Sequence, residues 1–388
     1  MTRTRLIPLA GLLCLSAGCT SFADRDTADP TSTPSSSAPT TTTSAPSTGL
    51  AVTEETDLAV DADTVTGARV VLDPDGSPVT LVLTSTGATV VASGGTTSVT
   101  GTVVGDLVTT DDGPVGVTLT ADPVSPDPVL GLYPFDDGQV PNGNGPAAQP
   151  VPLQPGETAP RGVPLFAAAS TDGATLYVLV EDTDAVGATV FALDPGTGEV
   201  LDTAEVDPGV ADPTALELAG LASTGDGGLV LGLTVDAAEG SASVLVGLDA
   251  DLEPVGDPVD VQPGDDRAPL VAVTTDADGA PVALLDDPAQ GLALVQPDLA
   301  TGGQESRPLT TDPGGRAAGL AVGESGVLVA LLDQGSPTVV LTPPGDADPT
   351  TLELCSGTGD ALAVTADPDG GFLVAGTCDG ESLLWTLG

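Results

Sequence analysis

Short apolar runs alternate along the chain with turns rich in Asp and Gly. One unit recurs, in which such a turn joins two apolar strands. Its copies lie at residues 70–82, 168–178, 221–231, 273–284, 321–331 and 364–374. Gly supplies the positive φ that a tight hairpin needs, and no long segment has helical periodicity. The pattern therefore predicts an all-β protein built from hairpins.

The turn glycines of these copies define a repeat length. They are Gly76, Gly173, Gly228, Gly279, Gly326 and Gly371. Successive spacings from Gly173 onward are 55, 51, 47 and 45 residues, and the first gap, of 97 residues, leaves room for a degenerate copy at 120–131. Seven repeats of this length predict a β-propeller with seven four-stranded blades. Two stacked β-domains and a six-bladed ring are the alternatives.

The two ends of the repeat array predict how the ring closes. The chain ends on the strand LLWTLG, the third strand of a blade, and no fourth strand follows it. The segment LAVDAD at 58–63 precedes the first full hairpin. We expect this N-terminal segment to supply the missing outer strand of the last blade and so to close the ring.

Residues 176–200 resemble the Tyr-Val-Thr-Asn and quinoprotein-type propeller repeats. The shared features are a Tyr-Val strand and a second strand that ends in Leu-Asp-x-x-Thr-Gly-x-Val. The resemblance covers one blade, supports the propeller fold and transfers no activity.

The first 19 residues have the pattern of a secretory signal. Arg3 and Arg5 precede an apolar run from Leu6 to Leu15, which is too short to span a membrane as a helix. Small residues then lead into Cys19. This segment resembles the signal peptide and lipobox of bacterial lipoproteins, which implies cleavage before Cys19 and a lipid on that residue. Secretion without lipidation is the alternative.

The domain organisation follows from these signals. Residues 1–18 are expected to be the signal peptide, 19–50 a lipidated Cys and a disordered Ser/Thr/Pro-rich tether, and 51–388 the propeller. The tether has few large apolar side chains to bury, and it would reach roughly 30 Å. Glycosylation of its Thr run stays open. The Val, Ala, Gly, Asp and Thr usage indicates a high-GC genome, for which we expect an actinobacterial source.

The charge of the chain limits its partners. There are 56 Asp and Glu against eight Arg, with no His, for a formal charge of −48. This excludes nucleic-acid binding as a main activity and opposes adsorption to anionic lipid. Without His, a Ser-His or Cys-His nucleophile system is excluded. Most acids lie at turn signals, where solvated carboxylates keep a protein soluble.

Two cysteines, Cys355 and Cys378, remain after processing. In an exported protein such a pair is expected to form a disulfide, and a closed loop of this size would contribute ~3 kcal/mol. This bond would secure the last blade. A reactive dithiol is the alternative.

Three turns begin like a calcium-binding loop. They are Asp73–Gly76, Asp276–Gly279 and Asp367–Gly370. None continues to the further ligand and distal Glu of that loop. We interpret them as hairpin turns and expect no cofactor, with structural calcium as the alternative.

A candidate binding loop lies at 131–150. It places Tyr133 and Phe135 beside a long Gly/Pro/Asn-rich stretch in the least regular repeat. Long loops on rigid scaffolds often carry binding sites. A tolerated insertion is the alternative.

Together these features predict an extracytoplasmic lipoprotein, held by its lipid on the outer face of the cell membrane. Its propeller would bind an envelope protein, a peptide or a cell-wall component without catalysis. A carboxylate- or metal-dependent hydrolase, similar to lactonases, is the alternative. Three or more carboxylates with raised pKa values around the central channel of the propeller would favour the enzyme.

Overall fold

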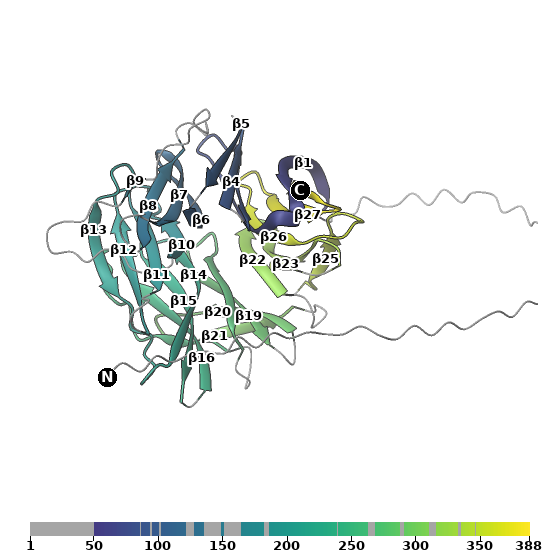
Figure 1. The fold of residues 1–388 in the computed structure, drawn as a ribbon. Coiled ribbons are helices and arrows are strands. Elements are labelled where there is room, and N and C mark those ends of the chain that lie inside the picture. Colours follow the sequence, from purple (N-terminus) through teal and green to yellow (C-terminus); the bar gives the residue numbers. More distant parts are fainter. Residues whose placement is uncertain are drawn as a thin grey trace, which may run out of the picture. The chain divides into compact units, whose positions relative to one another are not determined.

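The computed structural model describes a seven-bladed β-propeller (Figure 1). The residues described are 50–85, 87–93, 95–100, 102–121, 128–135, 149–150, 164–181, 186–238, 240–262, 268–287, 291–309, 316–332, 335–345 and 347–388. All strands lie in one compact unit, Gly49–Gly388. They form seven four-stranded antiparallel sheets, which confirms the predicted fold and blade number.

The first four blades follow one another along the chain. Blade 1 contains β2 (Val65–Leu72), β3 (Pro78–Thr84), β4 (Gly87–Ala92) and β5 (Gly95–Thr100). Blade 2 contains β6 (Thr102–Thr110), β7 (Gly113–Ala121), β8 (Pro128–Pro134) and β9 (Gln149–Pro150). Blade 3 contains β10 (Pro164–Ala169), β11 (Leu176–Glu181), β12 (Ala188–Leu193) and β13 (Val200–Glu205). Blade 4 contains β14 (Ala215–Ser223), β15 (Leu229–Ala237), β16 (Gly240–Leu248) and β17 (Val259–Asp260).

The last three blades complete the ring. Blade 5 contains β18 (Leu270–Thr275), β19 (Pro281–Asp287), β20 (Gly291–Pro297) and β21 (Gln304–Pro308). Blade 6 contains β22 (Arg316–Gly323), β23 (Gly326–Leu332), β24 (Thr338–Thr342) and β25 (Thr350–Glu353). Blade 7 contains β26 (Ala361–Ala366), β27 (Phe372–Cys378), β28 (Glu381–Leu387) and β1 (Val52–Asp61).

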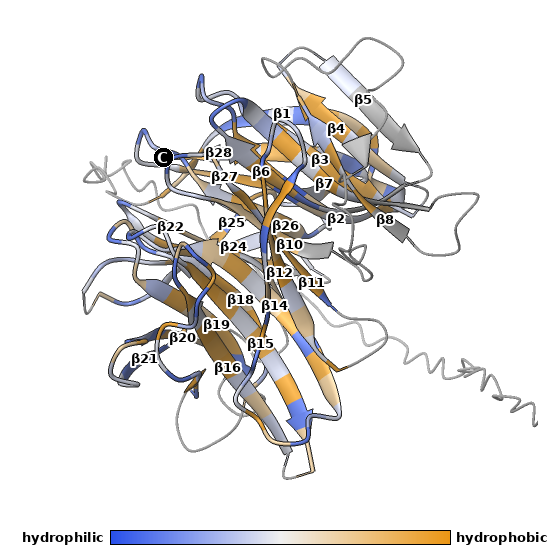
Figure 2. Ribbon diagram, turned by 90° about the vertical axis from the view of Figure 1, so that its left-hand side faces the viewer, coloured by the Kyte–Doolittle hydropathy of each residue, from blue (hydrophilic) through white to orange (hydrophobic). Residues whose placement is uncertain are grey.

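The hydrophobic core lies between the blades. Strands β11 and β19 each bury five consecutive residues, because both faces of such a strand are covered by neighbouring sheets. Figure 2 shows apolar colours along the strands and polar colours in the turns. The largest buried cluster joins blades 3 and 4, and others join blades 6 and 7 and blades 7 and 1. Packing between neighbours thus replaces the single core of a sandwich.

The N-terminal strand closes the ring, as predicted, although its bounds differ from the prediction. Strand β1 pairs antiparallel with β28, with Glu55 opposite Trp385. It begins at Val52, before the predicted 58–63 segment, and ends at Asp61, where a short 3-10 helix, η1 (Ala62–Thr64), follows. The early part was missed because its run of exposed acidic residues lacks apolar alternation.

The strand order gives the ring two distinct faces. We call the first the turn face, where strands 1 and 2, and strands 3 and 4, of each blade connect. We call the second the link face, where strands 2 and 3 connect and the chain passes to the next blade.

The first strands of the blades line the centre of the ring, and each carries a β-bulge against its second strand. The register shifts fall at Val65/Gly67, Val104/Asp106, Pro164/Phe166, Leu218/Gly220, Leu270/Ala272, Ala317/Gly319 and Ala361/Ala363. A bulge bends a strand and increases its twist. The seven equivalent bulges therefore belong to the repeat itself, although no residue type marks them.

Two predicted turn glycines are shifted by one residue. The residues with positive φ are Gly227 and Gly370, in place of Gly228 and Gly371. At Gly279 the need for Gly is steric as well, because a Cβ there would lie 1.9 Å from the backbone N of Gly225. The inner turns of blades 4 and 5 thus pack closely on the turn face.

The degenerate copy predicted at 120–131 was misplaced. The equivalent inner hairpin of blade 2 joins β6 to β7 at Thr110–Gly113. Residues 120–131 instead span the end of β7 and the start of β8. The error arose because a two-residue Asp-Asp turn replaces the longer Asp-x-Asp-Gly turn of other blades. The count of seven was correct even so.

Candidate functional site

An ion pair between the half-buried Arg69 and the buried Asp106 links three blades near the centre of the ring. The Arg69 Nε atom lies 3.0 Å from Asp106 Oδ1, which connects blade 1 to blade 2. Asp106 Oδ1 also accepts the Leu107 N–H at 2.9 Å, and its Oδ2 accepts the Ala167 N–H of blade 3 at 2.9 Å. We call Arg69, Asp106 and Ala167 the central clasp.

Burial raises the pKa of Asp106, and the Arg69 charge and the hydrogen bonds oppose that rise. A general acid or base would need an oxygen free to face a substrate. Both Asp106 oxygens already accept hydrogen bonds within the protein. This arrangement indicates a structural role for Asp106. It does not provide the three-carboxylate cluster that would favour an enzyme.

A pocket of about 640 Å³ opens at blade 4. Its lining comes from three places: the 208–212 link from blade 3, the described residues Ala237, Ala238, Gly240, Ala242 and Val244 of the β15–β16 hairpin, and Asp257, Pro258 and Asp260 around β17. The first two of these belong to the link face. This volume lies within the range of about 300–1,000 Å³ that is usual for ligand pockets.

The pocket exists because blade 4 is unevenly built. Strands β14, β15 and β16 have nine residues each, whereas the outer strand β17 has two and pairs only with Val244 and Leu245. The outer strand therefore pairs with only the middle of β16. Small residues line the pocket next to it, among them Ala237, Ala238 and Gly240. Short side chains and a short strand together leave the space.

The segment that roofs the pocket is fixed at both ends. Val206 N–H donates to the Ala188 carbonyl at 2.9 Å, and Thr214 N–H donates to the Asp236 carbonyl at 2.7 Å. Between these anchors Gly209 takes a φ of 69°. A Cβ there would lie 3.1 Å from Pro258. The roof therefore rests on the chain just before β17.

The pocket has an apolar floor and an acidic rim. Val244 is buried, and Val210 and Ala242 pack partly buried against the core between blades 3 and 4. The carboxylates Asp212, Asp257 and Asp260 belong to the lining, and among the described residues no Arg does. Such a lining can receive a ligand that combines an apolar stem with a positive charge.

The candidate loop residues Tyr133 and Phe135 lie on the turn face, at the end of β8. Phe135 is 3% exposed and packs with Leu81, Val90 and other residues of blade 1. Its N–H donates to the Pro114 carbonyl at 2.9 Å. Phe135 therefore packs as a core residue, and Tyr133 packs half-buried against the same cluster. Residues 136–148 of the loop lie outside the described residues.

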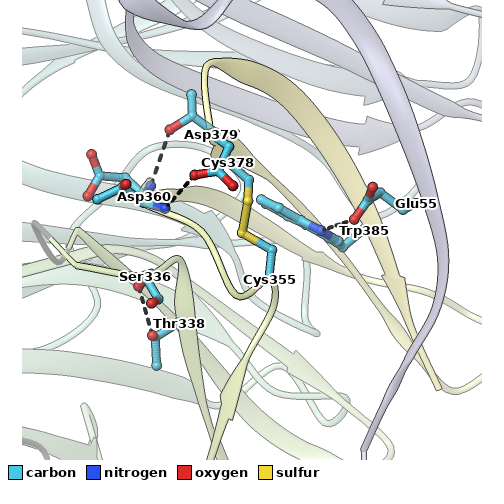
Figure 3. The surroundings of a disulfide bond; sticks show 10 residues. Glu55, Ser336, Thr338, Cys355, Asp360, Cys378, Asp379 and Trp385 are labelled. Atoms are coloured by element: carbon cyan, nitrogen blue, oxygen red, sulfur yellow. Dashed lines mark hydrogen bonds between the residues drawn. A yellow bond between two sulfur atoms is a disulfide. The ribbon is translucent and has the colours of Figure 1, made fainter.

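A disulfide joins Cys355 to Cys378, with a Cα–Cα distance of 6.6 Å. Cys355 lies in the connection from blade 6 to blade 7, and Cys378 ends β27. The bond therefore ties the incoming link to the second strand of the last blade. Figure 3 shows it beside the indole ring of Trp385.

Trp385 connects this disulfide region to the ring closure. Its side chain is completely buried in the cluster that contains Cys378. Its Nε1–H donates to Glu55 Oε2 on β1 at 3.1 Å, as Figure 3 shows. The sequence drew attention to Trp385 only as the sole Trp of the chain. Its role became visible once β1 and β28 were paired.

The Asp-x-Asp-Gly turns use their first carboxylate to hold their own backbone. Asp73 Oδ1 accepts N–H groups from Asp75 at 3.0 Å and Ser77 at 2.7 Å. Asp276 makes both equivalent contacts in blade 5, and Asp367 Oδ1 accepts the Asp369 N–H in blade 7. Over the residues that the structure describes, no group of three or more acidic or Cys side chains could hold a metal.

Cys19 and the rest of the predicted signal peptide and tether lie outside the described residues. Within the described part of the chain, no helix is long and apolar enough to cross a membrane. Lipidation of Cys19 therefore stays a prediction.

Comparisons with known proteins support the fold. No family model matches the chain, and no curated protein matches it. The chain is similar in structure to hydrazine synthase of Kuenenia stuttgartiensis, with a TM-score of 0.56, 15% identity, and coverage of 82% of this chain and 94% of that one. The β-propeller domain of Cps50 (Swd1) from Myceliophthora thermophila gives a TM-score of 0.53 and 10% identity, covering 85% and 98%.

A third similar structure is the extracellular domain of a putative hybrid two-component system from B. thetaiotaomicron. Its TM-score is 0.53 and its identity 12%, and the match covers 85% of this chain but only 39% of the other. At such low identities these similarities show the fold alone. They place the chain among β-propellers and say nothing of its ligand.

Proposed function

We propose that the chain is a lipoprotein, anchored through Cys19 to the outer face of the cell membrane, whose propeller is a non-catalytic binding scaffold. The observation that carries the proposal is the pattern of residues 1–19, in which a basic start, an apolar run and small residues lead into a cysteine. This pattern supports export, and its resemblance to a lipobox supports a lipid on Cys19. The rigid ring behind it supplies a surface for binding.

The described geometry supports this arrangement. The chain enters the propeller on the turn face, where Ala51 and Gly388 exchange two backbone hydrogen bonds of 3.2 and 3.1 Å. The blade 4 pocket is formed by segments of the link face. The chain entry and the pocket therefore lie on opposite faces of the ring.

Two further observations support an extracytoplasmic location. The Cys355–Cys378 disulfide fits an oxidising compartment. One of the similar structures is an extracellular domain. The proposed location rests on residues 1–19 and on the disulfide.

Fractionation of cells that make the full chain tests the anchor. The natural chain should partition with the membrane and incorporate labelled fatty acid. A Cys19→Ala variant should lose the label and appear in the medium, because the acidic surface opposes adsorption to anionic lipid. Membrane retention of this unlabelled variant would contradict the proposed anchor.

Capture experiments test the scaffold. The released Cys19→Ala chain, immobilised and exposed to envelope extract, should enrich a specific partner that elutes at high salt. A heat-denatured sample of the same chain controls for non-specific capture by acidic surface. Equal recovery on both samples would contradict a scaffold role.

A further inference from the structure

We propose that the blade 4 pocket binds an Arg side chain of a partner peptide. This inference rests on the proposed function, since it names the contact that an envelope-facing scaffold would make. The free carboxylates of the pocket, its apolar floor and its dimensions support the proposal.

The pocket carboxylates differ from the first carboxylates of the Asp-x-Asp-Gly turns. In the inner turns, carboxylates such as Asp73 accept hydrogen bonds from their own backbone. Among the described residues, the side chains of Asp212 and Asp257 accept no hydrogen bond and pair with no cation. Asp260 accepts one hydrogen bond, from Gln262 Nε2 through Oδ2 at 2.8 Å. These pocket carboxylates are therefore available to an incoming cation.

The shape of the pocket selects a cation with an apolar stem. A compact ion would meet the exposed rim and leave the floor of Val210, Ala242 and Val244 unused. An Arg side chain buries its three methylenes against such a floor while its guanidinium stays at the polar rim. Its fork of five N–H donors matches carboxylate geometry better than an ammonium does. The lining therefore favours a guanidinium on an aliphatic stem.

A peptide fits the pocket better than a free small amine does. The cavity of about 640 Å³ exceeds the volume of one side chain, so residues that flank the Arg can enter with it. The rim is open to solvent, because Asp212, Asp257 and Asp260 are all exposed. An open rim lets a chain pass across the pocket. We therefore assign the site to an Arg within an extended segment of a partner protein.

Binding of a defined peptide to the full chain carrying Cys19→Ala tests this inference. The probe is a fluorescent peptide, acetyl-Ser-Ala-Arg-Ala-Ser-amide, and its matched control carries citrulline in place of Arg. We expect saturable binding of the Arg peptide and at least about tenfold weaker binding of the citrulline peptide. Amide NMR shifts should be confined to residues around Gly209, Ala238 and Gly240. Equal binding of both peptides would overturn the proposal.

Variants separate the pocket from the general acidity of the protein. The triple change Asp212→Asn, Asp257→Asn and Asp260→Asn should weaken binding about tenfold. A control triple with the same charge change, Asp75→Asn, Asp278→Asn and Asp369→Asn on the turn face, should leave it unchanged. Ala242→Phe fills the floor of the pocket without changing the charge, and it should weaken binding at least as much as the pocket triple does. A control triple that weakens binding as much as the pocket triple would show that the peptide binds the acidic surface at large.

A free guanidinium compound tests the assignment to a peptide. Agmatine carries the same guanidinium and stem without a peptide chain. If it binds as tightly as the Arg peptide, the site takes a small cation and the peptide assignment is wrong. Loss of Arg-peptide binding while the envelope capture described above succeeds would overturn this inference alone and leave the scaffold role intact.

Discussion

Blade 7 and blade 4 share one four-stranded plan but are stabilised in different ways. Blade 7 takes its outer strand from the other end of the chain and carries the disulfide and the buried Trp385. Blade 4 takes all four strands from residues 215–260, and its three inner strands are nine residues long. Contacts between distant parts of the chain therefore concentrate where the ring closes, and the open space lies in the blade that is local in sequence.

This difference has a physical reason. A ring closed by pairing its two ends can open there without breaking the chain, so additional contacts at that place keep the fold closed. Blade 4 lies between two covalently continuous neighbours, with blade 3 packed on it through the largest buried cluster. It can therefore keep a two-residue outer strand and a pocket without exposing its core.

Removal of β1 should have the largest effect. A chain that begins at Val65 would uncover the edge of β28 and lose Leu58, which is 2% exposed in the cluster between blades 7 and 1. We expect the free energy of unfolding to fall by a large share of the ~5–15 kcal/mol that is typical of a domain, as measured by urea unfolding. Hydrogen exchange should accelerate in blade 7 before blade 4. Leu58→Asp in the intact chain is the second variant, and equal protection of both blades in it would contradict the comparison.

The Arg69→Met variant tests whether a contact between blades also stabilises the ring away from blade 7, where the ring closes. This change leaves the buried Asp106 charge of the central clasp unpaired, which should cost ~3–5 kcal/mol near neutral pH. The folded-state pKa of Asp106 lies above 3.8 in the natural protein, and loss of Arg69 would raise it further. A raised folded-state pKa stabilises the fold at pH values below the unfolded-state pKa of Asp106. This stability is lost as the pH rises through the folded-state pKa.

The cost of Arg69→Met should therefore shrink as the pH falls through the folded-state pKa of Asp106, because the carboxyl then becomes neutral. Urea unfolding of both chains at several pH values measures this. Adding Asp106→Asn to Arg69→Met removes the buried charge and should recover most of the loss at neutral pH. A cost that is the same at every pH would show that Arg69 acts through packing alone.

Loss of the disulfide should be the next largest effect. The double variant Cys355→Ala and Cys378→Ala opens a loop with a sequence separation of 23 residues. The expected cost is ~3 kcal/mol in the chain-entropy description, measured by thermal unfolding. Hydrogen exchange should rise around the connection from blade 6 to blade 7 and stay unchanged in β14–β16. Acceleration of exchange in blade 4 to the same extent would show that the bond stabilises the ring as a whole.

The sequence predicted the parts of this fold that depend on local chemistry. Asp and Gly mark hairpins because few other residues adopt those backbone angles or bond them from the side chain. This chemistry located six inner hairpins and the correct number of blades. The blade 2 hairpin was missed because Asp111 and Asp112 form a two-residue turn. The acidic start of β1 was missed because an outer strand exposed to water needs no apolar alternation.

The candidate site was harder to predict, because it depends on positions whose residue types carry no local signal. The blade 4 pocket depends on the shortness of β17 and on Ala and Gly side chains, none of which bears chemistry of its own. The central clasp joins Arg69 to a residue 37 positions away in another blade. Tyr133 and Phe135 attracted attention as rare aromatics, yet an aromatic at the end of a strand is more often a packing residue. The scarcity of Arg was the one signal that pointed toward the clasp.

The smallest predicted effect compares the inner turns of the two blades. In blade 7 the first residue, Asp367, accepts the Asp369 N–H, whereas in blade 4 the first residue, Thr224, donates its hydroxyl to Asp226 at 2.5 Å. This hydrogen bond lowers the pKa of Asp226, because it favours the charged form. Thr224→Val should therefore move the pKa of Asp226 back toward its ordinary value, as measured by NMR titration of its carboxyl carbon.

The lowered pKa of Asp226 also makes the stability of the fold depend on pH. A lowered folded-state pKa gives stability that is present above the unfolded pKa and is lost as the pH falls through the folded value. Thr224→Val should make the unfolding transition less dependent on pH on the acid side. The effect should be slight, because Asp226 is exposed to solvent. Ser223→Ala, which leaves the Thr224–Asp226 pair intact, is the matched control. An Asp226 pKa that moves equally in both variants would show that the turn backbone, and not the Thr224 hydroxyl, sets it.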